Sequence, residues 1–291
     1  MYKPCSGREF YDDEYGSDED DLNNQIVFST EKFWGRKEEL QTLKNLFDGL
    51  FCSNESDSQS LCPVAIIQAS SGSGKSALAE RFIKNLEKEV HDYTVCYIHG
   101  RFERTCNDPF SAIIEALDDF FRLQLLHSEF LSNLSRIRSA ITDSLATETL
   151  SLTRLIPSLV DVLRGAKAEK NDVIRGNKSD ETVPSTDSDS SVGYSDSSNH
   201  LKYLFKLLFC AICTKDYPLV MVLDNCQWAD DESLGVIESL LQDPDLQYFM
   251  FVGNVTRELA EVDDKSKFAK LLRELTRKIT RIDLLNLSID E

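Results

Sequence analysis

The sequence has little positive charge and no long apolar runs. Its 291 residues include 32 Lys and Arg against 50 Asp and Glu, a formal net charge of −18. Because a large nucleic-acid footprint needs a basic face, this balance argues against nucleic acid as a partner. No apolar run is long enough to span a bilayer, and the start MYKPCSGREF lacks the apolar core of a signal peptide. We expect no membrane partner and an intracellular protein, cytoplasmic rather than nuclear.

Cysteine spacing that would indicate a metal or disulfide framework is also missing. Eight cysteines are scattered among apolar stretches, and Cys210 and Cys213 form the only CxxC pair. A structural zinc site would need a second pair of ligands at metal-site spacing, and the sequence has none. In an intracellular chain of this size, the pattern predicts reduced, buried thiols.

The acidic residues are concentrated in two polar segments. Residues 1–22 carry eight acidic residues against Lys3 and Arg8, and residues 179–199 carry five acidic residues and no basic one. Segments rich in Ser and Asp cannot bury enough apolar surface to offset the entropy of ordering. We therefore expect a disordered acidic arm at 1–24 and a core at 25–291, with a disordered insertion at 165–199.

Short apolar runs alternate with segments of helical periodicity along the core. Strands are expected at 63–68, 93–98, 218–223, 248–253 and 279–284. Helices are expected near 33–51, 76–90, 107–121, 128–146, 151–164, 201–214, 231–242 and 265–277. Strands that are apolar throughout and alternate with helices predict an α/β fold with a parallel sheet covered on both faces.

The most specific motif lies between the first strand and its helix. The segment ASSGSGKS runs from Ala69 to Ser76. Gly72 and Gly74 let the backbone turn tightly, so that successive N–H groups and the helix N-terminus face an anion. Lys75 supplies a positive charge for phosphate oxygens, and Ser76 supplies a hydroxyl for Mg²⁺. The motif predicts a phosphate-binding loop, although Ala69 stands where the usual pattern has glycine; the simpler alternative is a flexible Gly/Ser turn.

An aspartate follows the third apolar strand. Asp224 ends the run that begins at Leu219, at the carboxyl edge where parallel sheets bind ligands. We expect Asp224 to hold Mg²⁺ through water. The next residue is Asn225, at a position where many ATPases with a phosphate-binding loop have an acidic residue. An amide can orient a water but cannot accept its proton, so slow hydrolysis and ordinary ATPase activity are two open alternatives. The expected catalytic residues are Lys75, Asp224 and Asn225.

Three segments carry a family resemblance. The segment FWGRKEEL (33–40) resembles the F-x-G-R-x-x-E-L box of AAA-type ATPase domains of the origin-recognition-like class, which also occur in STAND-related signalling ATPases. The segment LDNCQWAD (223–230) is similar to the L-D-D-x-x-W-A-D stretch of that class, and 100–112 resembles its second-strand region. The resemblance covers roughly residues 30–291. It implies a P-loop NTPase three-layer sandwich, with a five-stranded parallel sheet in the order 5-1-4-3-2 and helices on both faces.

The same resemblance implies roles for individual residues, with ATP or ADP and Mg²⁺ as cofactors. Ser76 and Asp224 would hold the metal. Asn254 or Arg257, at the end of the fourth strand, would sense the γ-phosphate. The adenine pocket would be lined by Phe33, Trp34, Gly35 and Arg36, and the phosphates would be surrounded by Ala69, Ser70, Ser71, Gly72, Ser73, Gly74, Lys75, Ser76 and Ala77.

Several functions fit this pattern. The first is an ATPase that couples Mg-ATP binding and hydrolysis to a conformational switch in signalling, and the second is a switch or scaffold that hydrolyses poorly. A small-molecule phosphotransferase is disfavoured by the helix and box before the first strand. A DNA-bound origin factor conflicts with the net charge. Domains of that class continue after the fifth strand into a helical lid, which is absent from this chain, so we expect either a fragment of a longer product or a reduced, switch-like module. The expected partners are nucleotide and other protein domains or a second copy.

Overall fold

The computed structural model describes residues 35–51, 62–89, 92–106, 108–126, 131–145, 149–164, 192–257, 266–275 and 279–285. The expected acidic arm at 1–24 lies outside these residues, as do Phe33 and Trp34 of the expected adenine pocket. Residues 165–191 of the expected insertion lie outside them too.

Five strands form one parallel sheet in the order β2-β3-β4-β1-β5. Read from the other edge, this is the predicted order 5-1-4-3-2, and the predicted fold class is confirmed. All six side chains of β3 are buried, as expected for an apolar strand covered on both faces. The strands are β1 (Val64–Ala69), β2 (Cys96–Arg101), β3 (Leu219–Asp224), β4 (Phe249–Thr256) and β5 (Ile279–Asp283).

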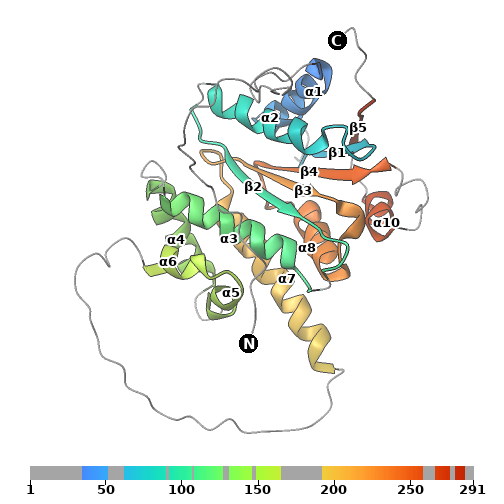
Figure 1. Ribbon diagram of the computed structural model, residues 1–291. Helices are drawn as coiled ribbons and strands as arrows, with labels where there is room; N and C mark the ends of the chain where they lie inside the picture. The colour runs from blue at the N-terminus through green and yellow to red at the C-terminus, as the bar shows by residue number, and fades with distance from the viewer. Residues whose placement is uncertain are drawn as a thin grey trace, which may run out of the picture. The chain divides into compact units, whose positions relative to one another are not determined.

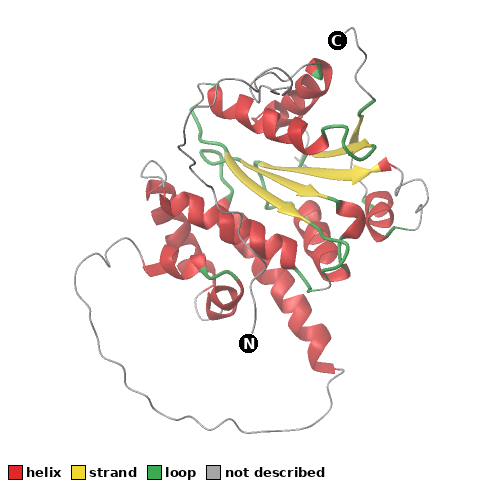
Figure 2. Ribbon diagram, viewed as in Figure 1, coloured by secondary structure: helices red, strands yellow, loops and turns green. Residues whose placement is uncertain are grey.

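Helices cover both faces of the sheet (Figures 1 and 2). One face carries α1 (Lys37–Asp48), followed by a 3-10 turn (Gly49–Phe51), and α2 (Lys75–Lys88). The other carries α3 (Ser111–Leu126), α7 (Val192–Ile212) and α8 (Asp231–Gln242), with α10 (Lys267–Glu274) against α8. Further helices add to this side: α4 (Leu131–Leu145) packs against α3 and α7, α6 (Ser158–Arg164) packs against α3, and α5 (Thr149–Leu155) packs against α4 and α6. None of the helices in the described ranges combines the length and apolar composition needed to cross a bilayer.

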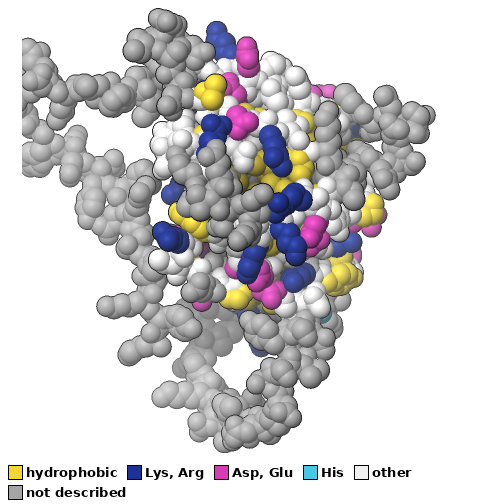
Figure 3. All heavy atoms as spheres, turned by 90° about the vertical axis from the view of Figure 1, so that its right-hand side faces the viewer, with side chains coloured by type: hydrophobic (Ala, Val, Ile, Leu, Met, Phe, Trp, Pro, Cys, Tyr) yellow, Lys and Arg dark blue, Asp and Glu magenta, His cyan; other side chains and the backbone are white. Residues whose placement is uncertain are grey.

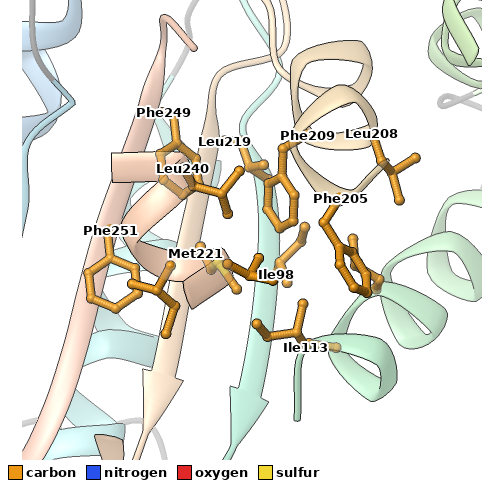
Figure 4. Packing of buried hydrophobic residues seen from close by; sticks show 14 of the residues in the cluster. Ile98, Ile113, Phe205, Leu208, Phe209, Leu219, Met221, Leu240, Phe249 and Phe251 are labelled. Atoms are coloured by element: carbon orange, nitrogen blue, oxygen red, sulfur yellow. The ribbon is translucent and has the colours of Figure 1, made fainter. Parts of the chain in front are cut away.

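The main core lies between the sheet and α3, α7 and α8. Figure 4 shows Phe205 and Phe209 of α7 and Ile113 of α3 close to Ile98 of β2. The ring of Phe209 meets that of Phe249 edge to face, with centroids 5.9 Å apart. Burying such side chains contributes roughly 1.5–3 kcal/mol each, so this layer fixes the sheet whose carboxyl edge carries the predicted site.

Two element boundaries differ from the prediction for clear reasons. The helix expected over 151–164 is two helices, α5 and α6, broken at Pro157. Proline lacks an N–H and disfavours helical geometry in the residue before it. The strand expected from Tyr93 begins at Cys96, because its neighbour β3 begins at Leu219, which pairs with Cys96. The Tyr93 ring stacks on Phe51 at a centroid distance of 4.5 Å.

The start of α7 also differs from the prediction. This helix begins at Val192, inside the segment 165–199 that was expected to be disordered. Ser198 is buried, and its hydroxyl bonds the Glu232 carboxylate on α8. A Ser/Asp-rich sequence can therefore continue a helix where a neighbouring helix supplies a polar partner.

The CxxC cysteines lie at the end of α7 and directly after it. The Cys210 thiol is 3.7 Å from an Asp243 carboxylate oxygen, and the Cys213 thiol contacts the carbonyls of Gln247 and Tyr248 at 3.0 and 2.9 Å. Burial raises the pKa of Cys210 to about 11. Both cysteines are free thiols in this structure.

Candidate functional site

The predicted phosphate-binding loop joins β1 to α2. Gly72 and Gly74 have φ values of 81° and 89°, a region that other residues rarely adopt. A Cβ built at either glycine would meet nothing within 4 Å, so open space lies beside both. The backbone N–H of Ser73 bonds the Ser70 carbonyl at 3.4 Å and closes the turn. The loop thus presents backbone and open space at the positive end of a helix, an arrangement that suits an anion.

Lys75, the first residue of α2, folds back across this loop. Its Nζ donates to the carbonyl oxygens of Ala69 and Ser70 at 3.0 and 2.9 Å. The ammonium group therefore contacts the first two of the residues that were predicted to surround the phosphates. A bound phosphate would compete with these carbonyls for the same donor.

The two predicted metal-binding residues lie in direct contact. Ser76 Oγ donates to Asp224 Oδ2 at 2.9 Å, and the Asp224 side chain is only 3% exposed. Burial alone would raise the pKa of Asp224, but hydrogen bonds from His99, Asn254 and Ser76 outweigh it and hold the pKa at about 2. A hydroxyl beside an ionised carboxylate is a pair of hard oxygen donors of the kind that Mg²⁺ prefers, so these residues fit the metal.

Asn254 of β4 lies on the other side of this carboxylate. Its amide nitrogen donates to Asp224 Oδ1, which brings this predicted residue into the same cluster. The Asn254 side-chain oxygen and Gln227 Nε2 are both buried, and neither has a hydrogen-bond partner within the described part of the chain. The Gln227 oxygen accepts a bond from the Thr256 backbone N–H at 3.3 Å. Unsatisfied polar atoms beside the ends of β3 and β4 fit a position where water or a polar ligand binds.

Two further residues reach Asp224 from β2, and the sequence analysis missed both. His99 Nε2 and Arg101 Nη2 lie 3.2 and 3.4 Å from Asp224 Oδ2. Arg101 pairs with Asp224 in the parallel register, and His99 is two residues earlier, so both project from the same face of the sheet. The sequence did contain a signal for both residues, because polar residues occupy every second position near the end of this otherwise apolar strand.

Asn225, the predicted water-orienting residue, has another partner. Its φ is 58°, a left-handed conformation that asparagine adopts more readily than most residues. Its amide nitrogen donates to the Phe102 carbonyl at 3.3 Å. This bond joins the segments that follow β2 and β3, so the amide serves a turn instead of standing free to orient a water.

The remaining predicted residues do not join the Asp224 cluster. Arg36 has a φ of 63°, and its guanidinium bonds Glu39 at 3.1 Å and the Leu285 carbonyl. This contact ties the start of α1 to the end of β5. Arg257 forms an ion pair with Asp283 of β5 at 2.9 Å. Ser71 and Ala77 are exposed, on the loop and in the first turn of α2 respectively.

Positive charge gathers on the side where the strands end. The strands run toward the right of Figure 1, so their carboxyl ends lie on that side. Figure 3 views this side and shows Lys and Arg side chains along the middle of the face, with some acidic side chains beside them. On a chain of net charge −18, such a local concentration favours binding of an anion at the carboxyl edge.

Comparisons with known proteins found solved structures of low similarity and one matching family. A solved structure of the Aeropyrum pernix ORC2 protein, in ADPNP–ADP complexes, is 14% identical, with a TM-score of 0.43 over 89% of this chain and 50% of that chain. One of Drosophila ORC bound to AT-rich DNA and Cdc6 is 12% identical, with a TM-score of 0.33 over 86% and 55%. The chain thus spans about half the length of either protein, and no curated protein sequence matched. The sequence profile of the AAA ATPase domain matches residues 32–252. Since this match covers well over half of the sequence, the chain belongs to the AAA ATPase domain family.

Proposed function

We propose that this AAA ATPase domain binds Mg-ATP, uses the bound nucleotide to control a conformational switch, and hydrolyses it slowly. The observation that carries the proposal is the contact of 2.9 Å between Ser76 Oγ and Asp224 Oδ2. It lies beside the loop to whose carbonyls Lys75 donates. In a P-loop site, a serine, an aspartate and a lysine so arranged hold a metal ion and the phosphates to which it binds.

Slow turnover is supported by Asn225. The side chain cannot accept a proton from the attacking water, and its nitrogen is already bonded to the Phe102 carbonyl. A faster ATPase remains the second candidate, because Lys75, Ser76 and Asp224 are all present. The two candidates differ in rate and not in what they bind.

Two measurements on the whole chain test this proposal. Binding of a fluorescent ATP analogue in the presence of Mg²⁺ should be clear for the wild type and lost for Lys75→Ala, because phosphate oxygens would then face only backbone dipoles. The matched control is Lys84→Ala, which removes the same charge from an exposed position of α2 and should bind normally.

Phosphate release at saturating Mg-ATP then separates the two candidates. We expect turnover well below ~1 s⁻¹, the lower end of ordinary enzyme rates, and only slightly above that of Lys75→Ala. A rate within the ordinary range would overturn slow hydrolysis and leave nucleotide binding in place. Unchanged ATP affinity in Lys75→Ala would contradict the nucleotide site itself.

The partners of the switch are part of the same proposal. Other protein domains or a second copy would receive the conformational signal. The chain spans about half the length of each of the two solved structures with which it was compared. The expectation against nucleic acid rests on net charge alone, and one of those proteins is a complex with AT-rich DNA. Filter binding of duplex DNA at moderate salt tests it, and tight binding would refute the expectation.

A further inference from the structure

Three side chains contact one oxygen of the Asp224 carboxylate. Oδ2 accepts from Ser76 at 2.9 Å, and it also lies 3.2 Å from His99 Nε2 and 3.4 Å from Arg101 Nη2. The other oxygen, Oδ1, is bonded by Asn254. A divalent ion held between Ser76 and this carboxylate would therefore approach an oxygen that a guanidinium ion already contacts.

The two groups from β2 are held differently. The His99 ring stacks beside that of Tyr97 at a centroid distance of 6.1 Å and an interplanar angle of 10°, and its side chain is 33% exposed. The Arg101 side chain is 59% exposed and meets the buried carboxylate through a single long contact. Because most of the Arg101 side chain is exposed, water can solvate the guanidinium when it leaves the carboxylate.

We propose that Arg101 is a positioning residue that competes with Mg²⁺ for Asp224 and so sets the Mg²⁺ concentration that nucleotide binding requires. This inference rests on the proposed Mg-ATP site. Its physical basis is that a guanidinium and a divalent cation repel each other when both approach one carboxylate oxygen. With the metal bound, the guanidinium is displaced; without it, Arg101 and His99 satisfy the buried charge of Asp224.

A Mg²⁺ titration of nucleotide binding tests this role without relying on turnover. Binding of fluorescent ATP and ADP analogues is measured across Mg²⁺ concentrations and in EDTA. The variants are Arg101→Gln, which removes the charge, and Arg101→Lys, which keeps it. The matched control is Arg104→Gln, which removes one positive charge from an exposed position three residues further along the same segment.

We expect Arg101→Gln to reach half-maximal binding at a Mg²⁺ concentration about three- to tenfold lower than the wild type, as removal of one partly screened charge implies. Arg101→Lys should stay close to the wild type, and Arg104→Gln should not shift. In EDTA, Arg101→Gln and Arg104→Gln should bind nucleotide with similar affinity. Because Arg101 is mostly exposed, thermal unfolding of these variants should match that of the wild type.

Two results would overturn the inference. One is an equal Mg²⁺ requirement in Arg101→Gln and Arg104→Gln. The other is a selective loss of ATP over ADP affinity in Arg101→Gln, which would make Arg101 a γ-phosphate ligand and not a competitor of the metal. A folded wild type that binds no nucleotide at any Mg²⁺ concentration would instead remove the proposed function, so the two failures are distinguishable.

Discussion

At the scale of single residues, Asp224 links stability to pH. Burial opposes its ionisation, yet hydrogen bonds from His99, Asn254 and Ser76 hold its pKa at about 2, below the ordinary value of 3.8. A lowered pKa means that the charged form stabilises the folded state above pH 4, and that this contribution is lost as the pH falls toward 2. The shift corresponds to about 2 kcal/mol.

Comparison of the wild type with Asp224→Asn measures this contribution. The difference in free energy of unfolding between the two proteins should shrink by about 1.5 kcal/mol between pH 6 and pH 2.5, because the asparagine does not titrate. Denaturant unfolding at a series of pH values provides the measurement. A difference that stays constant over this range would show that the carboxylate is not stabilised as the hydrogen bonds imply.

Gly100 of β2 tests how closely α3 packs on the sheet. A Cβ built there would lie 2.7 Å from the Ala112 carbonyl oxygen and 2.8 Å from Leu223 Cδ2. Because the carbonyl is backbone and cannot move cheaply, Gly100→Ala should lower the free energy of unfolding by about 1–3 kcal/mol. Gly49→Ala is the control, with nothing within 4 Å of its built Cβ, and it should be neutral or slightly stabilising in urea unfolding. Equal stability of the two variants would contradict the close packing.

At the scale of elements, Arg136 of α4 holds the end of α7. Its guanidinium donates to the carbonyls of Ala211 and Ile212, both at 2.7 Å, and lies over the Tyr217 ring at 5.2 Å. These carbonyls end a helix and lack helical partners, so Arg136→Met should cost about 2–3 kcal/mol. Arg154→Met, at an exposed position of α5, should change stability by less than about 0.5 kcal/mol. Thermal and urea unfolding check both variants, and a neutral Arg136→Met would show that α7 ends without this cap.

Most elements could be predicted because short apolar runs mark buried parallel strands. The helix expected over 231–242 has the bounds of α8, where the Asp230 side chain caps the first turn by accepting from the Ser233 N–H. The errors arose where a distant contact decided the outcome. Tyr93, which was expected to begin β2, stacks its ring on Phe51 before the strand starts. Ser198 bonds Glu232 within a Ser/Asp-rich segment that was expected to be disordered.

The candidate site was only partly predictable for the same reason. Lys75 and Ser76 are set by a local motif, and Asp224 by the end of an apolar strand, so each can be read from the sequence. His99 and Arg101 depend on β2 lying beside β3 in a register that pairs Arg101 with Asp224. The family resemblance implied the neighbour through the strand order 5-1-4-3-2, but the register is not encoded locally. Likewise, only the fold shows that the Asn225 amide bonds the Phe102 carbonyl.

At the scale of the whole molecule, nucleotide binding and the sheet are coupled. The first turn of α2 and the ends of β2, β3 and β4 all meet at Asp224. A ligand that binds there contacts segments far apart in the sequence and should stabilise the folded chain as a unit. At a ligand concentration of 100 Kd, the gain would be about 2.7 kcal/mol.

Calorimetric titration of ATP into the wild type and into Asp224→Asn, each with Mg²⁺ and with EDTA, is the decisive experiment on the metal-nucleotide site. We expect Mg²⁺ to tighten ATP binding to the wild type and this gain to be largely lost in Asp224→Asn, while affinity in EDTA should differ little between the two proteins. An equal gain from Mg²⁺ in both proteins, or no binding by the folded wild type, would contradict a metal-nucleotide site built on Ser76 and Asp224.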